Sequence, residues 1–482
     1  MKIRYMAVMV LSLCALAQST PKGASPEAQA IASRAFVGGH SMDYLTEMTD
    51  KFGPRLLSSD NYMNAAKWAA DQFRAMGIKD VKLESFAIPH SWKRVAATGR
   101  ILTPVERPLH LESLGWSPAT PDGGVKGEVV LLDEFSADAI KQRASEIKGK
   151  VVLLNMKKVY AARDESYKPY IDLEQAPTRL KEAGAAAILT SGNRPSQVLG
   201  TTSLGWDGNL SPLPAASIGK EDSDYLMRIA KTQRPTVEFA FSPQVGGATQ
   251  VPNVIAEIRG SEKPDEWIII GAHLDSWDFG TGAQDNGAGT AQVLEAARLI
   301  TSLGKAPKRS IRFALWAGEE EGLLGSRQYV KQHQGELAKC VAVLNTDNGS
   351  GEVQGWKVEG RDDLVAAMQP FSDSVLAPFG AGQVSKEITY DTDHGPFMLA
   401  GIPAFDLLVD MKAYMEVHHN AGDTLDKVNV RNLNIGAAVV AITADYIANA
   451  DKPIGPHLDR EALGKILKDK DLDEYLHSVG EW

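Results

Sequence analysis

The chain has 482 residues, of which 44% are hydrophobic and 23% are charged, with 51 Lys and Arg against 61 Asp and Glu. This composition is typical of a globular protein and excludes collagenous, disordered and polytopic membrane chains. The formal net charge of −10 argues against a nucleic-acid partner or a polybasic membrane contact, because such proteins usually carry an excess of basic residues. The length predicts two or three folded units at ~100–200 residues each.

Residues 1–17 have the pattern of a secretory signal peptide. Lys2 and Arg4 precede an apolar run that ends in the small-x-small sequence Ala-Leu-Ala, a typical cleavage site. The run is shorter than the ~20 residues that a helix needs to cross a bilayer. A lipoprotein modified at Cys14 is the alternative, but a leucine precedes that cysteine where a small residue is usual. We expect cleavage after Ala17 and an exported protein, periplasmic or extracellular, with no membrane span.

Cleavage would leave Cys340 as the only cysteine of the mature chain. A single thiol forms no internal disulfide, so an exported protein of this kind depends on its hydrophobic core for stability.

The first part of the main domain is expected over residues 18–117. The helical spacing of Trp68, Phe73 and Met76 predicts a helix over residues 65–76. The alternation of apolar and polar side chains that follows at residues 81–86 predicts a strand.

Residues 118–243 have a different texture. Short apolar strands, at 128–132 and 151–154, alternate with turns rich in Gly, Pro and Ser. A helix is expected to end near Gly184, and a buried strand follows it at 185–189. The segment holds no dense cluster of His and acidic residues, so we expect an inserted accessory domain without the main chemistry.

Residues 244–452 have an α/β pattern, and a charged tail with one amphipathic helix around residues 460–476 is expected over 453–482. Helical stretches separate four short apolar runs, at residues 267–272, 311–316, 341–344 and 404–408. Continuous apolar strands of this length are typical of a sheet that helices bury on both faces. In such sheets the chemistry lies at the strand ends.

Residues of metal-binding type occur at these strand ends, namely His273, Asp275, Asp285, Glu319, Glu320, Asp347, His418 and His419. Imidazole and carboxylate ligands without cysteine suit zinc or a similar divalent ion. Two histidines and three carboxylates can hold two ions when one carboxylate bridges them. The charges would then nearly cancel, which a partly dry pocket requires.

Each of these motifs has an ordinary structural interpretation when taken alone. A His-x-Asp pair is usually a hydrogen-bonded pair, a run of three glutamates is usually a solvated loop, and Asp-Asn-Gly is usually a turn. Their occurrence in order at consecutive strand ends favours one shared site.

The ordered motifs HLDS, DNGAG, EEEG, NTD and HHNAGDT resemble the co-catalytic di-zinc exopeptidase family, the aminopeptidase Y and glutamate carboxypeptidase group, and within it the carboxypeptidase Q branch. Residues 52–56 (FGPRL) and 88–90 (IPH) resemble the N-terminal part of that branch, and residues 118–243 resemble a protease-associated domain. The resemblance covers nearly all of the mature chain up to about residue 450. It implies a three-layer α/β sandwich with a mixed central sheet and an inserted protease-associated domain.

The same resemblance implies two Zn²⁺ per chain and a role for each site residue. It assigns His273 and Asp347 to one zinc, Glu320 and His419 to the other, and Asp285 to a bridge between them. His419 is preferred to His418 because the family ligand stands four residues before the Asp of Asp-Thr. Glu319 would be the general acid/base, and Asp275 would fix the His273 ring. The family also implies a cis peptide bond after Asp285.

Other residues near these motifs have less definite roles. Tyr390 and Tyr414 are alternative groups for stabilising the oxyanion, and the sequence favours neither. His394 is expected to line the pocket or to form a hydrogen bond, without a catalytic role. A homodimer through an apolar patch of Met411, Tyr414, Met415 and Val417 is also expected from the resemblance.

The expected substrates are short peptides with free termini, above all dipeptides, hydrolysed by metal-activated water. An aminopeptidase acting on longer peptides is the main alternative, because metal chemistry alone does not set substrate length. A glutaminyl cyclase shares a related fold but uses one metal. A non-catalytic binding protein would be expected to have lost the ligands that this chain retains.

Overall fold

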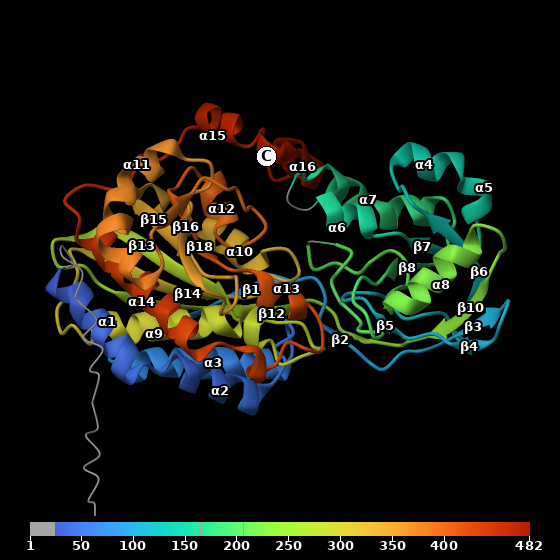
Figure 1. Ribbon diagram of the computed structural model, residues 1–482, viewed down its shortest axis with the longest axis horizontal. Coiled ribbons are helices and arrows are strands. Elements are labelled where there is room, and N and C mark those ends of the chain that lie inside the picture. Colours follow the sequence, from blue (N-terminus) through green and yellow to red (C-terminus); the bar gives the residue numbers. More distant parts are fainter. Residues whose placement is uncertain (1–24, 163–164, 206) are drawn as a thin grey trace, which may run out of the picture.

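The computed structural model of the protein describes residues 25–482 except 163, 164 and 206. The expected signal peptide and Cys14 lie outside the described residues. Figure 1 shows two bodies side by side, a larger one built around a central sheet and a second one around another sheet. Both bodies are mixed α/β, as the strand and helix patterns predict.

The main sheet has eight strands in the order β1-β12-β14-β13-β15-β18-β16-β17. In that order they are β1 (Asp80–Ile88), β12 (Thr249–Ile258), β14 (Arg309–Trp316), β13 (Lys263–His273), β15 (Cys340–Asn345), β18 (Ala404–Val409), β16 (Val353–Lys357) and β17 (Gln383–Ser385). The four central strands, β14, β13, β15 and β18, are parallel to one another, whereas β1, β12 and β16 pair antiparallel. The sheet is therefore mixed, and the four predicted apolar strands form its centre.

Side chains of β13 show why this sheet is buried on both faces. Ile268 and Ile270 point into one hydrophobic core, whereas Trp267 and Ile269 point into another. Successive side chains of a strand point to opposite faces, so a continuous apolar run needs a helical layer on each side.

The first layer contains the helices α1 (Pro26–Gly38), α2 (Ser41–Phe52), α3 (Asp60–Ala75), α9 (Ala288–Thr301), α11 (Asp362–Phe371) and α14 (Val430–Asn449). The opposite layer contains α10 (Leu324–Gln332), α12 (Gly395–Leu399), α15 (Arg460–Ile466) and α16 (Leu472–Val479). A further short helix is α13 (Lys412–Val417), and single turns are η1 (Ala283–Gly287), η2 (Leu337–Lys339), η3 (Ser372–Leu376), η4 (Ala377–Phe379), η5 (Leu425–Lys427) and η6 (Asp469–Asp471). The tail thus forms two helices where the sequence predicted one, because Lys470 and Asp471 adopt positive φ angles between them.

The second body is built on a sheet in the order β4-β3-β10-β6-β7-β8-β9-β5. These strands are β4 (Arg107–Pro108), β3 (Thr98–Thr103), β10 (Thr236–Ala240), β6 (Val125–Leu132), β7 (Val151–Leu154), β8 (Ala187–Ser191), β9 (Ala215–Ile218) and β5 (Leu111–Ser113). Its helices are α4 (Ala137–Gln142), α5 (Ala144–Ile147), α6 (Lys157–Ala162), α7 (Lys168–Glu182) and α8 (Lys220–Ala230). The sheet begins with β3 at Thr98, earlier than the expected boundary at residue 118. The strands β3 and β5 join it by pairing with the distant β10 and β9, and β4 joins it by pairing with β3.

The two bodies are joined by a short antiparallel ribbon. Strand β2 (Trp92–Lys93) leads out of the main body and pairs with β11 (Gln244–Val245), which leads back. The C-terminal segment spans the bodies a second time, and Figure 1 shows it in red beside α7. Tyr475 of α16 contacts Tyr167, at the start of α7, with ring centroids 5.6 Å apart.

The expected apolar patch does not form an apolar surface. Tyr414 and Val417 are buried within the main body, and Met415 is 37% exposed. The reason is that α13 contacts η1, and the Tyr414 ring packs beside Gly349 in the segment after β15. The homodimer remains a prediction, but this patch no longer supports it.

Among the described residues, no helix has both the length and the apolar character that crossing a bilayer requires.

The contact between α7 and α16 generates a prediction about pH. Burial raises the pKa of Glu174 to about 7, although the Tyr475 hydroxyl donates a hydrogen bond to it at 3.4 Å. The unfolded chain releases this proton near pH 4.5, so the folded state holds an extra proton between about pH 4.5 and 7 and loses stability as the pH rises through this window. Glu174→Gln should therefore raise the free energy of unfolding at pH 8, on the order of 1–3 kcal/mol, and change it little at pH 4.

Urea unfolding of both proteins at the two pH values measures this difference. Glu182→Gln, a change at the exposed end of the same helix, is the control. An equal effect of Glu174→Gln at both pH values would contradict the assignment.

Candidate metal centre

The candidate site lies at the edge where the parallel strands of the main sheet end. His273, the last residue of β13, is opposite Trp316, the last residue of β14. The chain leaving β14 carries the three glutamates 319–321, and Asp347 follows Asn345 at the end of β15. Parallel strands in register bring their carboxyl ends together, which is why side chains far apart in the sequence meet here.

Three of the expected ligands form one half of the site. The His273 Nε2 atom lies 3.1 Å from Asp347 Oδ1 and 3.3 Å from Asp285 Oδ1. The Nδ1 atom of the same ring lies 3.1 Å from the backbone oxygen of Asp275. An Nδ1–H that donates to this carbonyl leaves Nε2 to face the carboxylates. A neutral ring would then direct a lone pair at carboxylate oxygens, and a proton or a metal ion between them removes the repulsion.

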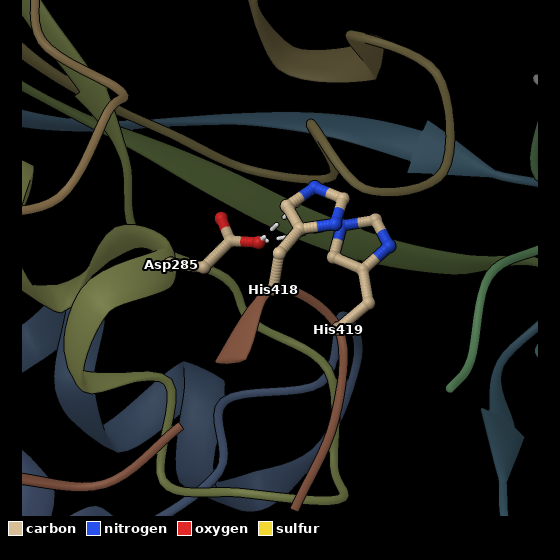
Figure 2. A group of neighbouring side chains, drawn as sticks. All are labelled: Asp285, His418 and His419. Atoms are coloured by element: carbon tan, nitrogen blue, oxygen red, sulfur yellow. Dashed lines mark ion pairs between the residues drawn. The ribbon is translucent and has the colours of Figure 1, made fainter. Parts of the chain in front are cut away.

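The other half comes from the loop after α13, and Figure 2 shows part of it. The His419 Nε2 atom lies 2.9 Å from Glu320 Oε2 and 3.3 Å from Asp285 Oδ2. The His418 ring is stacked on that of His419 at a centroid distance of 3.6 Å, and its Nε2 lies 3.9 Å from the same Asp285 oxygen. Both rings come close to Asp285, and His419 is the nearer one and the one that also reaches Glu320.

Asp285 stands between the two halves. Its Oδ1 atom faces His273 and its Oδ2 atom faces His419. The Asp285–Asn286 peptide bond is cis, as expected. The Asp423 carboxylate accepts hydrogen bonds from the backbone N–H of Gln284 at 2.6 Å and of Asp285 at 3.0 Å. The backbone at Asp285 is therefore held in place by the carboxylate of Asp423.

The Asp275 carboxylate holds the glutamate turn and not the His273 ring. It accepts backbone hydrogen bonds from Gly318 at 2.8 Å and from Glu319 and Glu320 at 3.3 Å. The distance from its Oδ1 to His273 Nδ1 is 3.8 Å. The ring is oriented by the Asp275 carbonyl, so the expected role of this residue belongs to its backbone, while its side chain orders the turn.

Arg55 is a positioning residue for which the sequence predicted no role. Its guanidinium is fully buried and donates hydrogen bonds to the carbonyl oxygens of Leu274 at 2.7 Å, Thr281 at 2.8 Å and Gly282 at 2.9 Å. These carbonyls lie on the segment between His273 and Asp285. Arg55 stands in the FGPRL motif, which was a usable signal, but only the fold shows which carbonyls it meets.

Glu319 and Glu321 are both buried, with different surroundings. The Glu319 Oε2 atom lies 3.9 Å from His273 Nε2, so Glu319 borders the centre. Both carboxylate oxygens of Glu321 are buried without a hydrogen-bond partner. Glu319 is the glutamate in the better position to exchange a proton with a molecule in the centre.

The pKa shifts reflect a dense cluster of charge. Burial lowers the pKa of His273, but the carboxylates of Asp347 and Glu319 raise it well above its usual value. Burial raises the pKa of Glu319 well above its ordinary range. Burial raises the pKa of Asp285, but the His273 and His419 rings, each 3.3 Å from one of its oxygens, hold it well below its usual value. The cluster therefore concentrates negative charge that a cation would neutralise.

Only one of the two candidate tyrosines lies at the centre. Burial raises the pKa of Tyr414 well above its ordinary value, and four carboxylates of the centre raise it further. Burial raises the pKa of Tyr390 to about 12, and its charged neighbours are Arg327 and Glu481 of the tail, not the carboxylates of the centre. His394 is buried, with its Nε2 atom 3.2 Å from Glu359 Oε1.

The donor set fits two divalent ions. Two groups of side chains could hold a metal, one of His273, Asp285 and Asp347 and one of Asp285, His418 and His419. The buried oxygens Asp285 Oδ2 and Glu320 Oε1 lack a hydrogen-bond donor. Two ligands ~2.1 Å from a tetrahedral zinc are about 3.4 Å apart, close to the 3.1–3.3 Å separations of His273 from its two carboxylates.

A hollow of about 180 Å³ opens beside the His419 half of the site. It is lined by Trp277, Gly280, Gly282, Asp285, Glu320, His419, Asn420 and Asp423. The Trp277 ring lies edge-on to His419 and also meets Gly115 of the second body. The second body therefore borders the site.

Comparison with known proteins identifies the family. Residues 253–444, which include all five expected ligands, match Peptidase family M28. Carboxypeptidase Q from Mus musculus is 30% identical over 431 residues, which cover 88% of this chain and 90% of that protein. The chain belongs to peptidase family M28. It is therefore a metallo-exopeptidase of the family that the ordered motifs resembled.

Solved structures agree with this assignment to the M28 family. A Peptidase M28 precursor from Shewanella amazonensis SB2B has a TM-score of 0.79 and 30% identity, covering 90% of this chain and 98% of that one. A zinc aminopeptidase from Bacillus subtilis has a TM-score of 0.65 and 23% identity, covering 86% of this chain and 95% of that one, and it shares the fold.

The contacts of Asp275 predict the effect of Asp275→Asn. The new amide would turn an N–H₂ group toward backbone N–H donors of the turn, so Glu320 should lose its orientation. We expect metal affinity to fall roughly 10–100-fold, as for other groups that orient ligands. Metal content after dialysis against graded chelator measures this affinity.

Asp265→Asn is the matched control, because Asp265 lies on β13, the strand that leads to Asp275, and its side chain is 74% exposed. Unchanged metal retention in the Asp275→Asn protein would show that the turn is ordered without this carboxylate.

Proposed function

We propose that this M28 peptidase is an exported enzyme that hydrolyses dipeptides and short peptides with free termini at a two-zinc centre. The observation that carries the proposal is the position of Asp285, whose two oxygens face two separate ligand groups. A single ion would need only one of these groups. The two-metal arrangement also distinguishes the site from the one-metal cyclase that shares a related fold.

In this proposal His273 and Asp347 hold one zinc, Glu320 and His419 hold the other, and Asp285 bridges the two. The pair of ions would lower the pKa of a water molecule toward neutrality and polarise the scissile carbonyl. The protein contributes the fixed positions: the Asp275 carboxylate orders the glutamate turn, and the Asp423 carboxylate holds the backbone of Asp285.

Glu319 is proposed as the general acid and base. Its carboxylate accepts the proton of the attacking water and later donates it to the leaving amine. The burial that raises its pKa keeps the protonated form accessible, while nearby cations would favour the ionised form. This balance suits a group that must both take up and release a proton within one cycle.

Tyr414 is proposed to stabilise the oxyanion. The ring is 5% exposed, and its pKa is raised by the same carboxylates that surround the metals. A phenol that stays protonated remains a hydrogen-bond donor through the reaction. Tyr390 is the less favoured group, because its charged neighbours are Arg327 of α10 and Glu481 of the tail.

The second body borders the site and could limit substrate length. Trp277 lines the hollow beside His419 and also meets Gly115 of the second body. We propose that the second body, as a protease-associated insert, limits substrate length. Export is proposed from the signal-peptide pattern of residues 1–17 and the single remaining thiol.

The substrate proposal is tested with one apolar dipeptide in free, N-acetylated and C-amidated forms, each with zinc and after chelation. Chelator-sensitive cleavage of the free form alone is expected, because both charged termini should contribute to binding. Cleavage of the amide as well would indicate a broader aminopeptidase, and cleavage of the acetylated form would indicate a carboxypeptidase.

The catalytic role of Glu319 predicts that Glu319→Gln keeps both metals and loses turnover by a factor of at least ~10². Metal analysis and kcat on the same samples separate the two effects. Glu320→Ala is the comparison variant, because Glu320 is the proposed zinc ligand next to Glu319. This change should lower the zinc content of the protein.

A near-normal rate in Glu319→Gln would show that another base acts, with Glu321 as the first candidate. Full retention of both metals in Glu320→Ala would refute its role as a ligand.

A further inference from the structure

The loop that carries His419 is held by the second body. The backbone N–H of Thr201 donates a hydrogen bond to the His419 carbonyl oxygen at 2.9 Å. The Arg194 guanidinium donates to the His418 carbonyl oxygen at 2.6 Å through Nη2. Gly200 and Asn420 form an antiparallel bridge beside these contacts. A segment of the second body therefore pairs with the backbone on both sides of a proposed ligand.

The ligand backbone has an unusual conformation at this point. His419 has a φ of +58°, a left-handed conformation that few residues other than glycine adopt. Within the main body, the N–H of Asn420 donates to the Val417 carbonyl and its side chain accepts from Gly422 at 2.7 Å. The carbonyls of His418 and His419 find their partners in the second body. The conformation that aims the His419 ring thus depends on contacts from both bodies.

The other half of the site has its supports within the main body. The His273 ring is oriented by the Asp275 carbonyl, and its own carbonyl accepts a hydrogen bond from the Thr290 hydroxyl at 2.9 Å. The two halves are therefore built differently: one rests on the main body, and the other rests partly on Arg194 and Thr201.

We propose that Arg194 is a positioning residue that sets the affinity of the His419–Glu320 half for its metal, so that docking of the second body controls occupancy of that half. The proposal rests on His419 being a ligand, as proposed above. A guanidinium hydrogen bond to a carbonyl is charge-assisted and therefore strong. Its loss would let the His418–His419 backbone relax and would lower the population of the ring orientation that faces Glu320.

The test is titration of Zn²⁺ into metal-free protein by calorimetry, for the unmodified protein and for Arg194→Ala, Arg194→Lys and His419→Ala. We expect Arg194→Ala to weaken one of the two zinc sites by at least about ten-fold and to leave the other unchanged, in line with groups that orient ligands. His419→Ala should weaken the same site further. Arg194→Lys keeps one charged donor and should recover part of the affinity.

Activity at controlled free zinc provides a second readout. The Arg194→Ala protein should be inactive at low zinc and regain its kcat at high zinc, whereas a general loss of structure would not be reversed by zinc. Arg234→Ala is the matched control. Arg234 also lies on the second body, where it pairs with Glu146 of α5 at 3.1 Å. Figure 1 shows α5 at the end of that body away from the main body.

The outcomes separate the inference from the proposed function. If His419→Ala weakens one site while Arg194→Ala binds both ions normally, the positioning role is wrong and the ligand role stands. If His419→Ala itself leaves both sites unchanged, the ligand assignment fails and the inference fails with it. If Arg194→Ala does not fold, Arg194→Lys and Arg194→Gln take its place in the titration. The proposal is overturned if both of these variants bind both zinc ions with the same affinity as the unmodified protein.

Discussion

The repulsion among buried carboxylates is the constraint on which the rest of this structure depends. Asp285, Glu319, Glu320 and Asp347 lie within a space that two imidazole rings share. Water would screen these charges, but the buried site has low polarity, and there like charges repel strongly. The fold keeps them together with fixed backbone dipoles: one buried carboxylate, Asp275, takes three amide N–H groups and so fixes the turn from which two of the glutamates extend.

Hydrogen bonds from three parts of the chain support the centre. Asp423 holds the backbone next to Asp285 from the far side of the loop. Behind it, Arg55 reaches from the N-terminal part of the chain to three carbonyls of the same loop. From the second body, Arg194 and Thr201 donate hydrogen bonds to the carbonyl oxygens of His418 and His419. Each of these supports uses charge-assisted or backbone hydrogen bonds, and these bonds are directional.

Much of the main body and the make-up of the centre could be predicted from the sequence, because they follow local rules. The four apolar runs became the four parallel strands since continuous apolar residues need two covered faces, and the polar residues that follow them meet at one edge. The start of the second sheet was missed because β3 and β5 pair with strands far away in the sequence, β10 and β9, and β4 is a two-residue strand that pairs with β3. The roles of Arg55 and of the Asp275 carbonyl could not be predicted either, since spacing along the chain does not show which backbone groups a side chain will reach.

The connection between the two bodies has a simple geometric origin. Strands β1 and β12 pair antiparallel up to Ile88 and Thr249, and a few residues farther on β2 and β11 continue the pairing with Trp92 opposite Val245. The whole second body therefore occupies the place of the loop in one long β-hairpin at the edge of the main sheet. The sheet needs only that the two ends of this loop stay side by side, so the loop could grow from a turn into a folded unit without disturbing the strands that position the metal ligands.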